Sequence, residues 1–243
     1  IEKGNTIRFF IWWKDIQKQK GGDYFDSRDS RVDIDLSAVM YDNDWKYLEH
    51  VSYTNLRSEK YHVVHSGDIT SAPEGASEFL DIDIDSVLKY GGRYIVMSLN
   101  SFTSQSFLSI PKCFVGWMVR KNPNSNEIYE PSTVENKIDL SANTRICIPV
   151  IINLLDRKII WTDLAFKKNP YWVNNIEGNQ KGMVLIGQAF TSMNRMNLYD
   201  LFMMHVLARG KLVETKDEAD NIFSIDDGIT PFDLDIIASK YML

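Results

Sequence analysis

Val32-Asp33-Ile34-Asp35-Leu36 is a stretch in which apolar and acidic residues strictly alternate. Successive side chains of a β-strand point to opposite faces, so the alternation predicts a strand with both carboxylates on one face. Runs of β-branched and aromatic residues, broken by Gly, Asn, Asp and Ser, continue to about Trp161. The clearest runs are residues 6–13, 32–41, 47–54, 79–84, 93–100, 112–120 and 145–153. This series predicts a mainly β fold, an antiparallel two-sheet β-sandwich.

The C-terminal part of the chain has helical patterning instead. Apolar residues follow helical spacing from about Tyr199 and stop at Gly210, a residue type that commonly ends helices. A second helix is predicted by Thr230 as N-cap, Pro231 at the first helical position and Asp233 three residues after the cap. We expect this helix to run to about Tyr241.

Length and composition suit a folded protein with one large or two modest domains. The chain has 243 residues, of which 44% are hydrophobic and 25% are charged. We expect a sandwich over residues 1–168 and a small α-rich extension over residues 169–243. About 40 helical residues are marginal for independent folding, so we expect the extension to pack on the sandwich.

Charge and cysteine usage limit the partners and the compartment. Lys and Arg number 27 against 33 Asp and Glu, and the resulting formal charge of -6 argues against a nucleic-acid partner. No stretch approaches the roughly 20 apolar residues of a membrane helix, and Ile1-Glu2-Lys3-Gly4 contains no apolar signal core. Cys113 and Cys147 lie far apart without CxxC spacing, which predicts buried free thiols and a cytoplasmic location.

The paired carboxylates of Asp33 and Asp35 suggest a cation site. Like charges this close repel unless a cation or a basic group lies between them, and Ca²⁺ takes 6–8 oxygen ligands. The alternative is an amphipathic strand whose acidic face is solvated.

Two further acidic segments follow along the chain. In His65-Ser66-Gly67-Asp68 the glycine admits a turn that can direct carbonyl oxygens inward, beside the Asp68 carboxylate. Glu78 stands at the junction of the next loop with a strand that carries Asp81, Asp83 and Asp85 on one face. These three acids are typical of a half-buried strand, so Glu78 is the better ligand candidate.

Taken in order, these segments resemble the TerD family of tellurium-resistance and stress-response proteins. Family members carry an Asp-[Leu/Ile]-Asp-x-Ser strand, then His-x-Gly-Asp, then a glycine-containing loop that ends in Glu and a strand, and the resemblance spans about residues 6–166. It implies a β-sandwich that binds calcium through loops at one end. It further implies that the calcium ligands are the side chains of Asp33, Asp35, Asp68 and Glu78 and the backbone oxygens of Ile69 and Gly75.

The sequence also departs from the family pattern. Typical members read Gly-Asp-Asn where this chain has Gly67-Asp68-Ile69, and their following loop is richer in Asp and Glu than residues 70–77. Because calcium affinity falls with ligand charge, we expect one site rather than the pair seen among relatives, and a weak or empty site is compatible with the sequence. The C-terminal helical part lies outside the usual module and indicates a divergent, larger subgroup.

Three functions follow from these motifs. The first is a noncatalytic calcium-binding module that presents a fixed surface to a protein partner in a stress-response system. The second is a glycoside hydrolase with Asp68 and Glu78 as acid and base. The third is calcium-dependent membrane docking, for which the loop over residues 66–77 lacks a basic or bulky apolar tip.

We expect His65 to be a hydrogen-bonded structural residue, and the four scattered histidines do not predict a zinc site.

Overall fold

The chain folds into two compact units, Ile1–Thr191 and Ser192–Leu243. The computed structural model describes residues 4–16, 30–122, 129–131, 134, 136–166, 179–192 and 197–242. The predicted domain boundary at 168/169 therefore lies outside the described residues. None of the helices within those ranges is long and apolar enough to cross a membrane.

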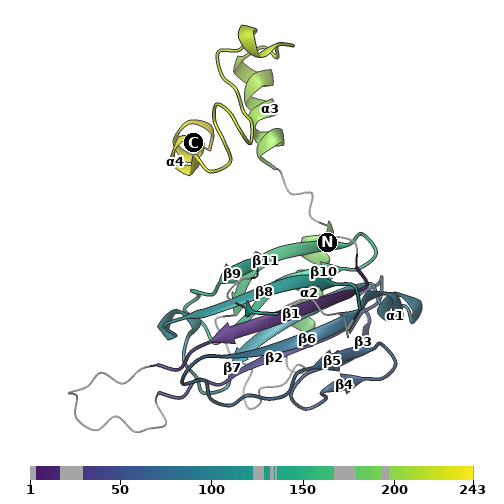
Figure 1. Ribbon diagram of the computed structural model, residues 1–243. Coiled ribbons are helices and arrows are strands. Elements are labelled where there is room, and N and C mark those ends of the chain that lie inside the picture. Colours follow the sequence, from purple (N-terminus) through teal and green to yellow (C-terminus); the bar gives the residue numbers. More distant parts are fainter. Residues whose placement is uncertain are drawn as a thin grey trace, which may run out of the picture. The chain divides into compact units, whose positions relative to one another are not determined.

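The first unit is a sandwich of two antiparallel sheets, as the strand pattern predicted (Figure 1). Sheet A has six strands in the order β4 (Arg57–Ser58), β5 (Val63–His65), β6 (Ala76–Asp83), β1 (Thr6–Trp13), β8 (Cys113–Arg120) and β9 (Lys137–Asp139). Sheet B has five strands in the order β11 (Lys158–Phe166), β10 (Ile146–Asn153), β7 (Tyr94–Ser101), β2 (Ile34–Tyr41) and β3 (Tyr47–Val51).

The core lies between the inward faces of the two sheets. Strand β1 contributes alternate residues from Ile7 to Trp13, and β2 contributes alternate residues from Ile34 to Met40. This is the aliphatic face that the alternation in β2 predicted. Cys113 and Cys147 are buried free thiols, as predicted, and burial raises the pKa of the Cys113 thiol well above its usual range.

The strand predicted to follow Glu78 begins earlier and ends earlier than expected, and it includes Glu78. Strand β6 ends at Asp83, whose side chain accepts a hydrogen bond from the Ser86 N–H and so caps helix α1 (Ile84–Lys89). Asp85 therefore lies in the first turn of a helix, and the prediction that it shares a strand face with Asp81 and Asp83 is wrong. The error arises because the alternation of apolar and acidic residues continues past Asp83, although Asp83 is the residue that caps α1.

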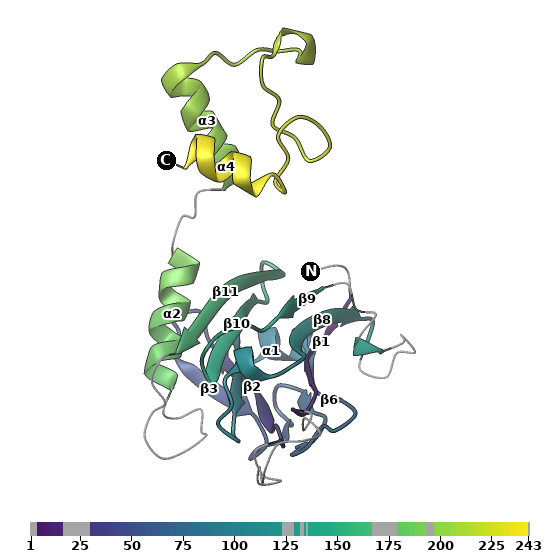
Figure 2. The same cartoon turned by 90° about the vertical axis from the view of Figure 1, so that its left-hand side faces the viewer.

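A second apolar cluster covers the outer face of sheet B. Helix α2 (Gln180–Ser192) places Met183 against Tyr41 and Val39 of β2, and Figure 2 shows the helix beside the strands of this sheet. Trp45 belongs to the same cluster and stacks on Tyr94, with the ring centroids 4.4 Å apart. Sheet B is therefore buried on both faces along β2, which explains why all eight residues of that strand are buried.

The second unit contains helices α3 (Leu198–Arg209) and α4 (Leu234–Tyr241) and the 3₁₀ turn η4 (Lys216–Glu218). The predicted stop of the first helix at Gly210 is confirmed. The predicted start of the second is wrong, because α4 begins after Asp233 rather than after Thr230. The Asp233 carboxylate instead accepts hydrogen bonds from the Thr230 N–H and hydroxyl, and these bonds lower its pKa.

Candidate metal centre

Three of the predicted ligands come together at one end of the sandwich. Ligand oxygens of Asp33, Asp35 and Asp68 all lie within 4.8 Å of one another. Asp33 and Asp35 are only 4% and 6% exposed, whereas Asp68 is exposed. The alternative of a solvated acidic face on this strand is therefore wrong, and the two buried carboxylates stand beside a third at its surface.

The crowding changes the acidity of Asp33. Burial is the largest cause that raises its pKa to about 6, and the neighbouring Asp68 carboxylate is the next. Arg31 acts in the opposite direction, but its guanidinium is 4.0 Å from the Asp33 carboxylate and Arg31 is partly exposed. Glu78 and Asp15 add smaller repulsion. A divalent cation at this position would relieve the repulsion directly.

Asp33 is expected to make the metal-free protein less stable as the pH rises. Its pKa of about 6 in the folded protein exceeds the value of about 3.9 in an unfolded chain, so the folded state binds more protons between these values. The free energy of unfolding should therefore fall from about pH 4 to about pH 6, by up to about 3 kcal/mol. Urea unfolding of the metal-free chain across this range measures the effect.

The matched variants for this measurement are Asp33→Asn and Asp44→Asn. Asp33→Asn removes the titrating group and should flatten the decline, whereas Asp44 lies on an exposed turn and its replacement should leave the decline intact. An equal slope in the wild type and in Asp33→Asn would contradict the assignment to Asp33.

Glu78 is not one of the three mutually close carboxylates and has a different set of contacts. Its side chain is 1% exposed, and its two oxygens accept hydrogen bonds from the backbone N–H groups of Leu36 (3.1 Å) and Ile69 (2.8 Å). Glu78 is in β6 of sheet A and Leu36 is in β2 of sheet B, so the carboxylate joins the two sheets. The group of mutually close carboxylates among the described residues does not include Glu78.

His65 is a structural residue, as predicted. Its Nε2 lies 3.1 Å from the Leu36 carbonyl oxygen and 3.5 Å from the Glu78 carboxylate, and its Nδ1 accepts a hydrogen bond from the Gly67 N–H. The ring is fully buried. These contacts fix the start of the turn that carries Asp68.

Two glycines shape the loop between His65 and Glu78. Gly67 and Gly75 have φ values of 121° and 98°, in the left-handed region that favours glycine. A Cβ on Gly75 would also lie 2.3 Å from the Trp12 ring, so this position excludes any side chain. The loop thus passes close to β1 and returns to the sandwich next to the carboxylates.

The sequence interpretation missed Asp15, which organises the same end of the molecule. Its carboxylate accepts hydrogen bonds from the Val32 N–H, the Ala72 N–H and the Ser71 hydroxyl. It thereby connects the end of β1, the approach to β2 and the loop that follows Asp68. No local motif marks Asp15, because its partners come from two other segments of the chain.

Comparison with known proteins supports a relationship for the sandwich. No family model matches the chain. Tellurium resistance protein TerZ of Serratia marcescens is 32% identical over 113 residues, which are 45% of this chain and 57% of TerZ. The match therefore spans little more than half the length of that relative.

Two solved structures share the fold. The homologue of telluride resistance protein TerD, SCO6318 from Streptomyces coelicolor A3(2), has a TM-score of 0.52 at 11% identity and covers 72% of this chain and 98% of its own. The protein of unknown function SAV2460 has a TM-score of 0.51 at 10% identity and covers 73% and 98%. The chain is thus similar in sequence to TerZ and in fold to the TerD homologue, in agreement with the resemblance to the TerD family of tellurium resistance proteins.

Proposed function

We propose that this chain is a noncatalytic calcium-binding interaction module of a cytoplasmic stress-response system of the tellurium-resistance type. The observation that carries the proposal is the convergence of Asp33, Asp35 and Asp68, two of them buried. Buried like charges are costly unless a cation compensates them, and the partly exposed Arg31 at 4.0 Å offers weak compensation. A bound cation would add positive charge among the three carboxylates.

The chemistry of the donor set fits Ca²⁺. Three carboxylates supply hard oxygen ligands and no sulfur or nitrogen ligand stands in the group, which favours calcium over zinc or copper. The backbone oxygens of Ile69 and Gly75, on the loop that carries Asp68, would add to the coordination number. Both Glu78 oxygens already accept backbone hydrogen bonds, so Glu78 would position this loop. The small number of carboxylates favours one calcium ion.

The contacts of Glu78 also support a noncatalytic role. A general acid or base in a glycoside hydrolase must reach the substrate with a carboxyl oxygen. The Glu78 side chain is almost fully buried, and backbone N–H groups occupy both oxygens. Calcium would instead order the loop over residues 66–77 and so present a fixed surface to a protein partner. The similarity to a tellurium resistance protein supports the tellurium-resistance part of the proposal.

Calcium is expected to raise the melting temperature of the metal-free chain. A ligand at 100 times its dissociation constant stabilises the native state by about 2.7 kcal/mol, which corresponds to a shift of about 5–10 °C for a chain of this size. Mg²⁺ should shift it less, because magnesium demands a more rigid octahedral site. Differential scanning calorimetry after chelator treatment, with each ion up to millimolar concentration, measures both shifts.

Asp68→Asn and Glu74→Gln form a matched pair for this titration. Both residues lie on the same loop and are exposed, but only Asp68 belongs to the carboxylate group. Asp68→Asn should weaken calcium binding at least about tenfold, since it removes one of three charged ligands. Glu74→Gln should bind as the wild type does. No shift at millimolar calcium, or equal shifts in both variants, would refute the calcium site.

A further inference from the structure

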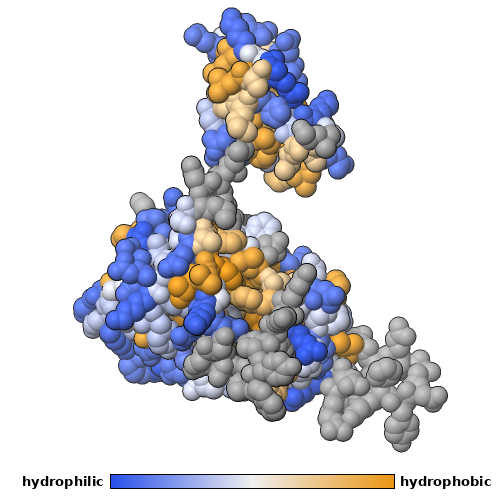
Figure 3. Space-filling view, turned by 180° about the vertical axis from the view of Figure 1, so that it is seen from behind, coloured by the Kyte–Doolittle hydropathy of each residue, from blue (hydrophilic) through white to orange (hydrophobic). Residues whose placement is uncertain are grey.

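Among the described residues of the second unit, more large hydrophobic side chains are exposed than buried. Among its described residues the buried hydrophobic side chains are Phe202 and Ile237. Its exposed large hydrophobic residues are Tyr199, Met204, Leu207, Leu212, Ile225, Phe232, Leu234, Ile236 and Met242. Figure 3 shows apolar side chains among hydrophilic ones on the visible face of this unit. Such exposure in a soluble protein marks an interaction surface.

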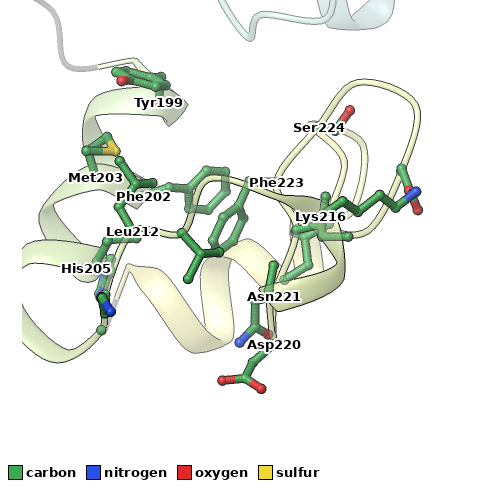
Figure 4. A pocket seen from close by; sticks show the side chains of 18 of the residues that line it. Tyr199, Phe202, Met203, His205, Leu212, Lys216, Asp220, Asn221, Phe223 and Ser224 are labelled. Carbon is green, nitrogen blue, oxygen red and sulfur yellow. The ribbon is translucent and has the colours of Figure 1, made fainter.

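Part of this surface lines a cavity of about 1150 Å³ within the unit (Figure 4). The cavity lies between α3, the segment after it and the end of α4. Phe202 and Phe223 stack with centroids 3.9 Å apart, and both contact the Tyr241 ring edge-to-face. Leu212 lies beside the stacked rings in Figure 4 and remains 66% exposed. The rings are held by one another, so the apolar wall does not require an occupant to form.

Acidic residues outnumber basic residues on the lining of the cavity, because Glu214, Glu218, Asp220 and Asp227 stand beside Arg209, Lys211 and Lys216. Glu214, Glu218 and Asp220, which we call the acidic rim, are exposed. Three basic residues also line the cavity. Lys216 is paired with Asp227, the Arg209 guanidinium donates to the Lys240 carbonyl oxygen and lies over the Tyr241 ring, and Lys211 is exposed. Residues 192–243 as a whole contain nine Asp or Glu and five Lys or Arg, a net charge of −4.

We propose that this cavity is a docking site for an amphipathic basic segment of a partner protein, with apolar side chains against Leu212 and Phe223 and Lys or Arg at the acidic rim. This inference goes beyond the calcium module and does not depend on it. Charge complementarity selects the occupant, because a second copy of this unit would bring two negative surfaces together. An anionic membrane surface would be repelled for the same reason.

Panning of a phage library of random 16-residue peptides on the full chain tests the proposal. We expect the enriched peptides to combine apolar residues with a net positive charge. Synthetic copies should bind about tenfold more weakly to Leu212→Ser, which removes an exposed apolar contact, and to Glu218→Lys, which reverses a rim charge. Leu108→Ser and Glu59→Lys alter exposed residues of the sandwich and should leave binding within about twofold of wild type.

Several results would overturn the proposal. These are no enrichment, enriched peptides without net positive charge, and peptide affinity unchanged by Leu212→Ser. Circular dichroism on each variant establishes that it is folded. Sedimentation velocity tests the second-copy alternative: self-association that Leu212→Ser abolishes would make this chain the occupant. Flotation with phosphatidylserine vesicles tests whether the cavity binds a membrane. Vesicle binding that Leu212→Ser abolishes would show a lipid surface as the occupant and would overturn the proposal of a protein partner.

Discussion

Replacement of Glu78 by alanine is expected to lower the free energy of unfolding by about 2–5 kcal/mol. The buried carboxylate is the acceptor for the Leu36 and Ile69 N–H groups, and each buried donor left without an acceptor costs about 1–3 kcal/mol. The substitution also leaves a cavity between the two sheets. Urea unfolding of the metal-free full chain measures the loss.

Two further variants serve as controls for Glu78→Ala. Glu78→Gln keeps one acceptor oxygen but replaces the other by an amide that donates, so we expect an intermediate loss. Glu74→Ala removes a carboxylate whose side chain is 94% exposed, and it should change stability by less than about 0.5 kcal/mol. A Glu78→Ala variant as stable as Glu74→Ala would show that the bridge between the sheets contributes nothing.

The strands with a clear alternating pattern could be predicted from the sequence. Residues 6–13 match β1, because every second side chain enters the core and the intervening ones lie on the outer face of sheet A. Strands β4, β5 and β9 were missed because each has only two or three residues, too few for a period to show. Strand β2 was predicted from its alternation although both of its faces are buried.

In the candidate site, too, residues in local sequence patterns were predicted, and residues defined by tertiary contacts were not. The Asp33 and Asp35 pair and the turn that carries Asp68 are local patterns, and the structure brings these three residues together. Asp15 was not predicted, because its contacts exist only once three segments meet. Glu78 was predicted as a metal ligand at the junction of a loop and a strand, but it lies within β6, and its hydrogen bonds to two backbone segments depend on the packing of one sheet on the other.

Helix α2 was not predicted from the sequence, and the glycines it contains explain why. It contains Gly182 and Gly187, and glycine lowers helix propensity by about 1 kcal/mol relative to alanine. The low helix propensity of these two glycines therefore argues against a helix at this position, although tertiary contacts stabilise α2. At Gly187 the reason is visible, since a Cβ there would lie 2.0 Å from two carbons of the Trp45 ring.

Gly187→Ala is accordingly expected to destabilise the chain by about 1–3 kcal/mol, despite the better helix propensity of alanine. Trp45 cannot retreat easily, because its ring stacks on Tyr94 at 4.4 Å with an interplanar angle of 7°. The helix would have to move away from sheet B and expose part of the cluster around Met183. Thermal unfolding, together with hydrogen exchange of the α2 amides, measures the loss and locates it.

Gly182→Ala is the matched control, and the two substitutions should differ in sign. A Cβ at position 182 would meet the Phe166 ring at 3.4 Å, an ordinary contact distance. The added methyl group therefore gains helix propensity without a clash, and we expect stability to rise by up to about 1 kcal/mol. If alanine stabilised the chain equally at both positions, the close approach of α2 to Trp45 would be wrong, and the cover over the outer face of sheet B would need another explanation.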